Sequence, residues 1–560
     1  MTQSTIDQLN SIANSYEKEF FNHFPEHGLF WGKTDIPLDR FTDHSLSALE
    51  NWNKKEDAFL FQLNKLPESE LSNTPEHITY LLLKQHLENN IADRISKNEL
   101  WSVDPLQGWH NMLTMIADKQ PIETLEQQKK ALIRWETVGR IADDEIQNLS
   151  IGLKKGYSAP KPAVERVIAQ LKLIINTPIA DSAFLDFTKK STNEDFKNQF
   201  LHIVKNSIYP ALTRYLTFLE NDYLPKAREE IGLSALPDGK AAYQAKIKKE
   251  TTLNITPEEV YQYGLAYMDK LTNEIMTIGQ KEFGTNDLVE IFHQTKTNPK
   301  YLYKSEEEIL AYNQSALERA IQKAPEWFDK MPIAEGVLKP YPLHRAKTGA
   351  PGEYHPPSLD GSRPGIFYIN TFEPEKRSRA DHEATLFHEL IPGHHFQIAL
   401  VQEDKSQNSI NQYLWNCGYG EGWALYVERL ADKMGLYSDE IARLGMLSNE
   451  ALRAARLVVD PGIHYMNWTR QEAIEYLKKH TALKQETIES EVDRYIMLPG
   501  QATSYMLGKR EIEDLQKLSI EKLGDKFSYR EFHNQVLKNG TVTLPMLKEQ
   551  ILQWIASVKQ

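Results

Sequence analysis

The chain has 560 residues and a mass of 64.6 kDa, which is enough for several domains or for one large helical one. Hydrophobic residues make up 41% and charged residues 26% of the sequence, and the mean hydropathy of −0.53 excludes an integral membrane protein. The 65 basic and 78 acidic residues give a net charge of −13, so the chain has no general electrostatic attraction for nucleic acid or for an anionic membrane.

Cysteine usage and the first residues bear on the compartment. Cys417 is the one cysteine, so no intrachain disulfide can form and nothing indicates an oxidising environment. The first five residues are polar and lead into an amphipathic pattern, without the basic stretch and apolar run of a signal peptide. We expect a cytoplasmic protein, although a chain whose leader had been removed would look the same.

Helical periodicity predominates along the chain, and we expect a mainly α protein. Near the start, apolar residues recur at intervals of three and four: Ile6, Leu9, Ile12, Ala13, Tyr16 and Phe20. Similar patterns predict helices over residues 44–65, 76–98, 123–149, 160–176 and 193–221. The turn at residues 236–239, LPDG, is the expected boundary between an N-terminal lobe, residues 1–240, and a C-terminal lobe, residues 241–560.

Three segments have the residues of a helix start. Thr256 is followed by Pro257 and two glutamates, which predicts a capped helix that runs to about residue 283. Residues 469–472, TRQE, and residues 528–531, SYRE, match the capping box.

Strand signals are few. The clearest is residues 365–370, GIFYIN, which is rich in β-branched and aromatic residues. A loop rich in Pro and Gly, residues 349–364, precedes it, and a long irregular loop inside a helical protein is often functional.

The segment that carries chemistry is residues 382–397, HEATLFHELIPGHHFQ. It holds four of the chain's 17 histidines and two glutamates, with apolar residues between them. A surface helix with incidental histidines is the alternative, and it is favoured for a lone histidine but not for this cluster.

Zinc chemistry accounts for these residue types. A catalytic Zn²⁺ binds imidazole nitrogens and a carboxylate and keeps one position for water. In the usual His-Glu-x-x-His helix, the second histidine lies four residues after the first, and the glutamate acts as general base. His388 and Glu389 fit the first half, but residue 392 is Pro, so the strict motif fails.

The next histidines are His394 and His395. At about 100° per residue, an undistorted helix turns His394 roughly 120° away from His388 and His395 only about 20° away. Pro392 and Gly393 favour a break or bulge, which could turn His394 inward instead. The residues alone leave open which histidine is the second ligand.

A third ligand must come from another segment. Glu421 stands between two glycines and ahead of an apolar helix, as expected for a carboxylate that enters a buried site. The alternative is an acidic residue that is favoured at a helix N-terminus by the helix dipole. Beside the His-Glu cluster, the metal interpretation is favoured.

Residues 421–428, EGWALYVE, resemble the Glu-Gly-Phe-Ala-x-Tyr-x-Glu segment of the gluzincin aminopeptidases, whose first glutamate is the third zinc ligand. The His-Glu-x-x-Pro-Gly-His-His form resembles the bacterial domain-of-unknown-function 885 family (DUF885). That resemblance extends over most of the chain, with further matches at residues 360–365, 452–460, 462–464, 468–470 and 499–505. It implies a mainly helical fold around a deep channel, with a small β element near the site.

The resemblance also implies roles for individual residues. A Gly-His pair supplies the second ligand in the related peptidases, which indicates His394 and gives the zinc ligands His388, His394 and Glu421. Residues 365–370 would form an edge strand that pairs with the extended substrate, which makes Asn370 a substrate contact.

Other family-like segments supply candidates for handling the substrate. The Tyr505 hydroxyl or His464 could donate a hydrogen bond to an oxyanion, although either could equally be a core residue. Arg453, Arg456 and Arg510 could bind a peptide carboxylate, although an ion pair between helices is the alternative for each.

Three functions are compatible with these residues. The leading hypothesis is a zinc-dependent peptidase of oligopeptides, in which Glu389 accepts a proton from the zinc-bound water. The second is a metal-dependent amide hydrolase with a non-peptide substrate. The third is a binding or scaffold protein whose site has lost its metal. None of them calls for nucleic acid or a membrane as a partner.

Overall fold

The computed structural model describes residues 2–72, 74–342, 346, 352–358, 361, 363–406 and 408–559. They form two compact units, one of residues 1–73 and 87–242, the other of residues 74–86 and 243–560. The second unit holds all the candidate site residues. Its short segment 74–86 lies in the first half of the sequence, and no local sequence pattern predicts that this segment belongs to the second unit.

The first unit is built from helices. They are α1 (Thr2–His23), α2 (Pro25–Phe30), α3 (Leu46–Asn64), α4 (Glu68–Leu71), α6 (Trp109–Lys119), α7 (Leu125–Glu136), α8 (Val138–Lys154), α9 (Lys161–Asn176), α10 (Glu194–Ile203) and α11 (Tyr209–Phe218). The helical pattern over residues 123–149 corresponds to two helices, α7 and α8, which are separated at Thr137. Two helices, α5 (His77–Asp93) and α12 (Gly239–Thr251), have residues in both units.

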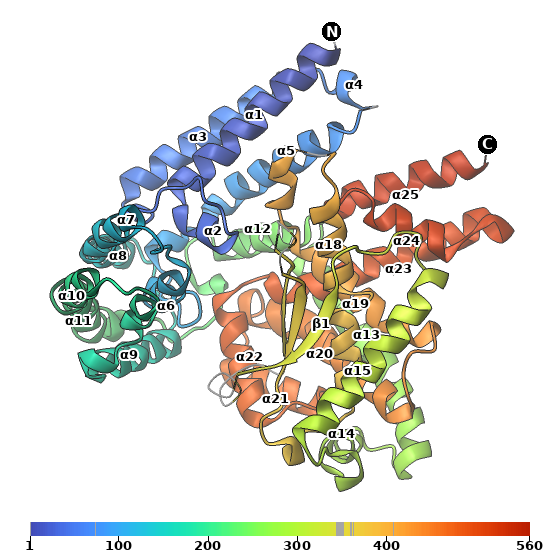
Figure 1. Cartoon of the computed structure of the whole chain (residues 1–560). Helices are drawn as coiled ribbons and strands as arrows, with labels where there is room; N and C mark the ends of the chain where they lie inside the picture. The colour runs from blue at the N-terminus through green and yellow to red at the C-terminus, as the bar shows by residue number, and fades with distance from the viewer. Residues whose placement is uncertain are drawn as a thin grey trace. The chain divides into compact units, whose positions relative to one another are not determined.

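The second unit is also mainly helical, which confirms the predicted fold class (Figure 1). Its helices are α13 (Pro257–Phe283), α14 (Leu288–Thr297), α15 (Glu306–Lys323), α17 (His382–Glu389), α18 (His394–Glu403), α19 (Cys417–Lys433), α20 (Glu440–His464), α21 (Arg470–His480), α22 (Gln485–Met497), α23 (Ser504–Leu523), α24 (Tyr529–Leu537) and α25 (Leu544–Lys559). The deep channel implied by the resemblance stays a prediction.

The helix starts follow the sequence signals closely. Thr256 and Glu259 form a reciprocal capping box at α13, and Thr469 and Glu472 form another at α21. At α24, the Ser528 hydroxyl accepts from the backbone N–H of Glu531, but the reciprocal bond is absent between these two described residues. The predicted box is therefore only half formed there.

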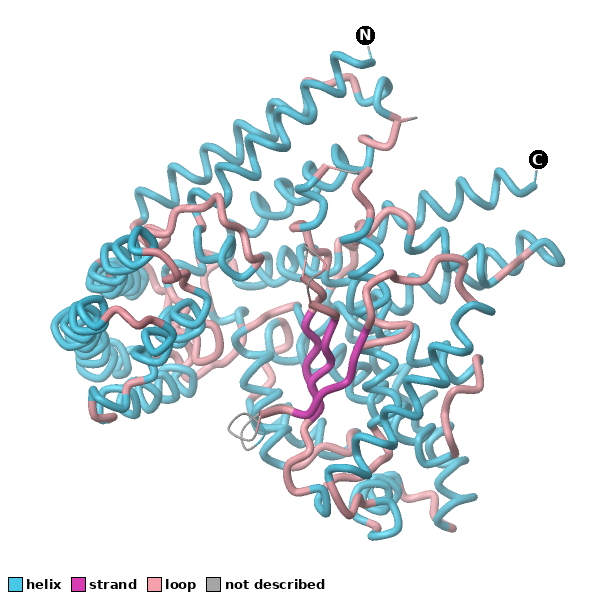
Figure 2. Tube along the Cα trace, in the orientation of Figure 1, coloured by secondary structure: helices cyan, strands magenta, loops and turns pink. Residues whose placement is uncertain are grey.

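A small sheet of three strands lies among the helices of this unit (Figure 2). The strands are β1 (Gly336–Pro340), β2 (Gly352–His355) and β3 (Gly365–Ile369), in the order β1-β3-β2. β3 pairs parallel with β1 and antiparallel with β2. Part of the loop predicted over residues 349–364, and of the family-like segment 360–365, lies outside the described residues.

The prediction that residues 365–370 form an edge strand is wrong. β3 is the central strand, so both of its edges are already hydrogen-bonded to other strands and cannot pair with a substrate. The physical reason is visible in its burial: four of the five residues of β3 are buried, on both faces of the strand. A continuous apolar run of this kind is typical of a strand that is covered on both sides.

The close approach of α19 and α23 sets the position of the candidate site. These helices pack against each other through glycines at residues 418, 422 and 508. A Cβ atom on Gly422 would lie 2.5 Å from the backbone of Gly508, and one on Gly508 would lie 1.7 Å from the carbonyl oxygen of Gly418. The absence of side chains thus brings the first turn of α23 beside the first turns of α19.

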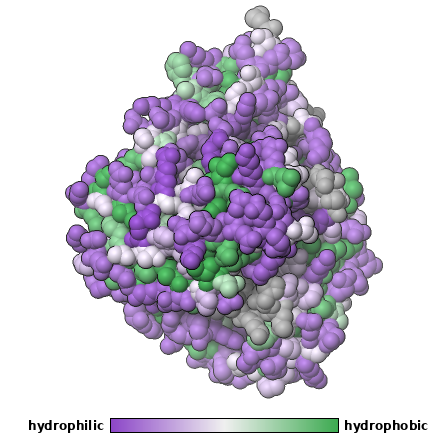
Figure 3. All heavy atoms as spheres, turned by 60° about the vertical axis from the view of Figure 1, so that its left-hand side comes forward, coloured by the Kyte–Doolittle hydropathy of each residue, from purple (hydrophilic) through white to green (hydrophobic). Residues whose placement is uncertain are grey.

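The face in Figure 3 is mostly hydrophilic, and its hydrophobic residues lie in small separate patches. In the part of the chain that the structure describes, no helix has both the length and the apolar character needed to cross a bilayer.

We predict that Gly422→Ala destabilises the second unit by about 1–3 kcal/mol, because the new methyl group would force α19 and α23 apart. Thermal denaturation should show a lower unfolding temperature. The control is Gly139→Ala in α8, where the nearest atom to the new Cβ is Arg214 Nη2 at 3.4 Å, and where alanine should be neutral or stabilising. An unchanged unfolding temperature for Gly422→Ala would contradict the close packing described here.

Candidate metal site

The helix that carries His388 ends abruptly after Glu389. α17 stops at Glu389, residues 390–393 form a turn, and α18 begins at His394. A Cβ atom on Gly393 would lie 1.8 Å from the carbonyl oxygen of His388, so only glycine fits where the chain turns back. The buried indole N–H of Trp423, from α19, donates to the carbonyl oxygen of Pro392 at 3.0 Å and fixes the turn. The break that Pro392 and Gly393 predict is therefore present.

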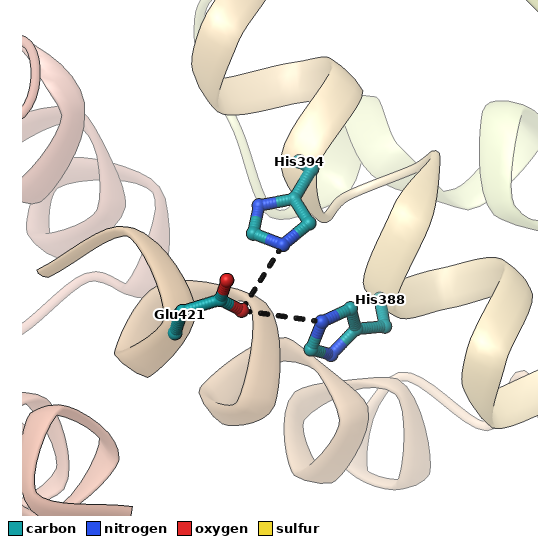
Figure 4. A group of neighbouring side chains, drawn as sticks. All are labelled: His388, His394 and Glu421. Carbon is teal, nitrogen blue, oxygen red and sulfur yellow. Dashed lines mark ion pairs between the residues drawn. The ribbon is translucent and has the colours of Figure 1, made fainter. Parts of the chain in front are cut away.

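This turn brings three side chains from three helices together. Figure 4 shows His388 of α17, His394 of α18 and Glu421 of α19 pointing toward one point. Glu421 Oε2 lies 3.3 Å from His394 Nε2 and 3.7 Å from His388 Nε2. One nitrogen or oxygen from each residue lies within 4.8 Å of the other two.

These three residues could hold a divalent metal ion. Two imidazoles and a glutamate are the donor set of one class of catalytic zinc site, and ligands about 2.0–2.1 Å from zinc in a tetrahedron lie about 3.3 Å apart. The separations of 3.3 and 3.7 Å from Glu421 Oε2 are close to that value, and the three donor atoms all lie within 4.8 Å of one another. His388 and His394 are largely buried, with side-chain exposures of 7% and 11%.

Glu428 orients the first histidine. Its buried carboxylate lies 2.8 Å from His388 Nδ1, which leaves Nε2 directed at Glu421. A carboxylate behind a metal-binding histidine fixes the ring and increases its basicity. The sequence interpretation missed this role, although the signal was present: Glu428 lies seven residues after Glu421 and so on the same face of α19.

The charges of the cluster are strongly coupled. Burial raises the pKa of Glu421, but the charges and hydrogen bonds of His394 and His388 outweigh it and hold that pKa well below its usual value. Burial lowers the pKa of His388, yet the nearby carboxylate of Glu421 and the hydrogen bond with Glu428 raise it to about 9. Glu428 is buried and lies 3.9 Å from the Arg453 guanidinium, whereas the negative charge of Glu421 faces the two histidines, where either a proton or a divalent cation can balance it.

His395 lies outside the cluster. Its Nε2 lies 2.9 Å from the carbonyl oxygen of Ala334, and its Nδ1 lies 2.9 Å from the Tyr354 hydroxyl of β2. Its ring also packs against Gly336 and Gly365, where a Cβ atom would collide with it. His395 therefore joins α18 to the sheet.

The first His-Glu pair of the segment is also structural. His382 Nδ1 lies 3.0 Å from the side-chain nitrogen Nδ2 of Asn313, and burial lowers the pKa of His382 to about 3. Glu383 is fully buried, where it accepts a hydrogen bond from Arg319 at 2.6 Å and another from the backbone N–H of Ser438.

Glu389 differs from Glu383, the other acidic residue of this segment. It is half-buried at the end of α17, directly after His388, and its carboxylate has no hydrogen bond or ion pair with any other described residue. Its negative charge acts on two neighbours. It raises the pKa of His388, which burial lowers, and it raises the pKa of the Tyr354 hydroxyl, which burial raises by a larger amount. Its carboxylate thus acts on a histidine of the cluster and on a tyrosine of the sheet.

Tyr505 lies beside the cluster on the first turn of α23. Burial raises the pKa of its hydroxyl, and the nearby negative charge of Glu421 raises it further. The hydroxyl oxygen accepts hydrogen bonds from Arg494 at 3.3 Å and Gln501 at 3.5 Å. Because both partners are donors, the Tyr505 O–H is left to donate, and it donates to none of the described residues.

The predicted substrate-binding arginines have protein partners. Arg456 is buried, donates to Glu491 at 2.8 Å and to the Tyr495 hydroxyl, and packs its guanidinium over the Tyr505 ring. Arg510 pairs with Glu511 at 2.8 Å and lies over the ring of Tyr263.

His464 and Asn370 are held in the core. His464 is fully buried, with Nε2 2.8 Å from the carbonyl oxygen of Tyr495 and its ring against Tyr243. The Asn370 side chain donates to the carbonyl oxygen of Ala346 and accepts from the backbone N–H of Phe372. None of these contacts joins either residue to His388, His394 or Glu421.

Comparisons with known proteins identify a family and a fold. Residues 25–551 match the family described as "Bacterial protein of unknown function (DUF885)". A solved structure described as a "putative lipoprotein" from Colwellia psychrerythraea is similar over 99% of both chains, with a TM-score of 0.90 and 24% identity. A "putative lipoprotein of unknown function" from Shewanella oneidensis is similar over 97% of this chain and 99% of that one, with a TM-score of 0.80 and 17% identity. No curated protein matches the chain.

We predict that His394→Ala lowers the affinity for Zn²⁺ by more than about 100-fold, whereas His395→Ala changes it by less than about tenfold. Loss of a ligand should cost more than the about 10–100-fold that loss of a residue hydrogen-bonded to a ligand costs, and the described hydrogen bonds of His395 go to Ala334 and Tyr354 and not to a ligand. Calorimetric titration with Zn²⁺ measures both, with circular dichroism to establish that each variant is folded, and His395→Gln replaces a misfolded alanine variant. Loss of zinc binding in the His395 variants alone would contradict the assignment.

Proposed function

The chain belongs to the DUF885 family, bacterial proteins of unknown function, and we propose that it is a zinc-dependent metallopeptidase that cleaves oligopeptides. One observation carries the proposal: donor atoms of His388, His394 and Glu421 lie within 4.8 Å of one another, and Glu389, whose carboxylate has no partner among the described residues, directly follows the ligand His388. The resemblance of residues 421–428 to the gluzincin segment agrees with this donor set.

Each residue has a distinct part in the proposed reaction. Zinc, when bound by the three ligands, would supply a Lewis acid that polarises the substrate carbonyl and acidifies water. Glu389 would accept the proton of the attacking water and pass it to the leaving amine. Glu428 would hold the His388 ring in the orientation that binding requires.

Tyr505 would stabilise the negative charge that develops on the carbonyl oxygen. Its O–H is fixed in place by two donors to its oxygen and remains able to donate. A donor positioned before the reaction needs no reorganisation in the transition state, and a buried one acts in a medium of low dielectric constant. The positive charges of Arg494 and Arg456 close to the ring favour this donation.

An amide hydrolase with a non-peptide substrate would use the same residues, and cleavage of a peptide library by the zinc-loaded protein separates the two functions. A metal-free scaffold is the weaker alternative, because no described residue forms a hydrogen bond or an ion pair with the Glu389 carboxylate that would explain its place after His388. The cytoplasmic location expected from the sequence stays a prediction, since the two structural neighbours are described as lipoproteins.

We predict that Glu389→Gln keeps the zinc content of the wild type and lowers kcat for peptide hydrolysis by about 10²–10⁴-fold, because glutamine keeps the shape but cannot accept the proton. Atomic absorption and a peptide assay measure the two properties. The control is Glu383→Gln, which removes a buried carboxylate from the same helix but should leave hydrolysis near normal. Retained activity in Glu389→Gln would refute its role as base, and lost zinc would make Glu389 a ligand.

We predict that Tyr505→Phe lowers kcat by about 10²-fold with little change in KM, because it removes a hydrogen bond that strengthens only in the transition state. The control is Tyr495→Phe. Tyr495 also contacts Arg456, but it donates to Glu491 at 2.6 Å, so its loss should affect stability and spare kcat. Equal losses of kcat in both variants would indicate a structural role for Tyr505.

A further inference from the structure

A partly exposed tryptophan borders the candidate metal site. Trp415 has 42% of its surface exposed, although most tryptophans bury much more of their surface. Its ring centroid lies 6.2 Å from that of His394, with an angle of 55° between the rings. A large apolar surface is thus in contact with solvent at the edge of the cluster.

The exposed indole is held firmly in place. The residues on either side of it are tied to Thr541: the carbonyl oxygen of Leu414 accepts from the Thr541 hydroxyl, and the Asn416 side chain donates to the Thr541 carbonyl oxygen at 2.6 Å. The ring itself rests on Gly420, where a Cβ atom would lie 2.1 Å from the indole.

This arrangement differs from that of an incidental surface residue. Single exposed hydrophobic residues are common and need no explanation. Trp415, however, is fixed from both sides, and the glycine beneath it directly precedes the candidate ligand Glu421. Packing of the indole on Gly420 therefore fixes its position relative to the cluster, while one part of the ring stays free.

We propose that Trp415 forms the apolar wall of a substrate subsite that takes an aromatic or large aliphatic side chain next to the scissile bond. The inference rests on the proposed peptidase function and adds to it a preference among oligopeptides. Contact with a rigid indole favours aromatic side chains in particular, since ring pairs add to the free energy of simple burial. Trp415 is a specificity-determining residue in this proposal and takes no part in proton transfer.

The test compares two peptides that differ only by Phe or Ala beside the cleaved bond, with each side of the bond examined in turn. In zinc-loaded wild-type protein we expect the Phe peptide to be preferred on one side. Trp415→Ala should lower kcat/KM for that peptide by about tenfold and change it less than about twofold for the Ala peptide. Trp415→Phe should restore most of the preference.

Two further variants separate this role from general damage. Gly420→Ala keeps the indole but displaces it, and it should also reduce the preference for Phe. Ile520→Ala removes a side chain of similar exposure, 41%, about 22 Å along α23 from Tyr505, and should leave the preference unchanged. Equal losses for both peptides in Trp415→Ala, or no loss for either, would overturn the proposal.

A binding measurement distinguishes failure of this inference from failure of the proposed function. Calorimetric titration of the Glu389→Gln protein with the same peptides needs no turnover. Tighter binding of the Phe peptide that disappears in Glu389→Gln/Trp415→Ala supports the subsite even if wild-type protein cleaves neither peptide, in which case the peptidase proposal alone fails. Equal binding of the Phe and Ala peptides overturns the subsite.

Discussion

The candidate site depends on the turn of the chain at residues 390–393. A regular helix would carry His394 away from His388, and only the loss of helical hydrogen bonds at this turn allows α18 to start beside the end of α17. Gly393 makes the turn sterically possible, and Trp423 satisfies the carbonyl of Pro392 from the helix that bears Glu421. The same indole thus ties all three ligand-bearing helices together, so the spacing of the ligands is part of the core packing.

Electrostatics supply the second constraint. Glu421 and Glu428 are both directed at His388 in a largely buried environment, where an isolated carboxylate is very costly. Positive charge therefore stabilises the arrangement, and Arg453, with Nη2 3.9 Å from Glu428 Oε1, supplies part of it. A purely structural cluster could balance Glu421 with an arginine or a lysine as well, as the buried pair of Lys509 and Glu450 does elsewhere in this unit. Here the charge comes from two histidines, and because imidazole nitrogens also bind metals, a metal ion can replace their protons.

The sequence predicts those features that local physics determines. The helical fold, the capped starts of α13 and α21 and the break at Pro392 all follow from neighbouring residues. The central place of β3 does not, because it depends on which strands pair across long loops, although its continuous apolar run was a signal. Helix geometry alone could not choose between His394 and His395, since the turn angle at Gly393 decides the choice. The role of Glu428 required knowing that α19 packs against α17.

The functional candidates differ from the other polar residues that the sequence suggests for the substrate in whether the protein already satisfies their hydrogen bonds. Arg456 has a buried carboxylate partner, and the amide of Asn370 has both a donor and an acceptor partner among backbone groups. Such residues stabilise the fold and have little capacity left for a ligand. By contrast, Glu389 has no described hydrogen-bond partner and the Tyr505 O–H has no described acceptor. The unused capacity of both groups lies around one cluster, and a folded protein bears the cost of such unsatisfied groups chiefly where a ligand completes them.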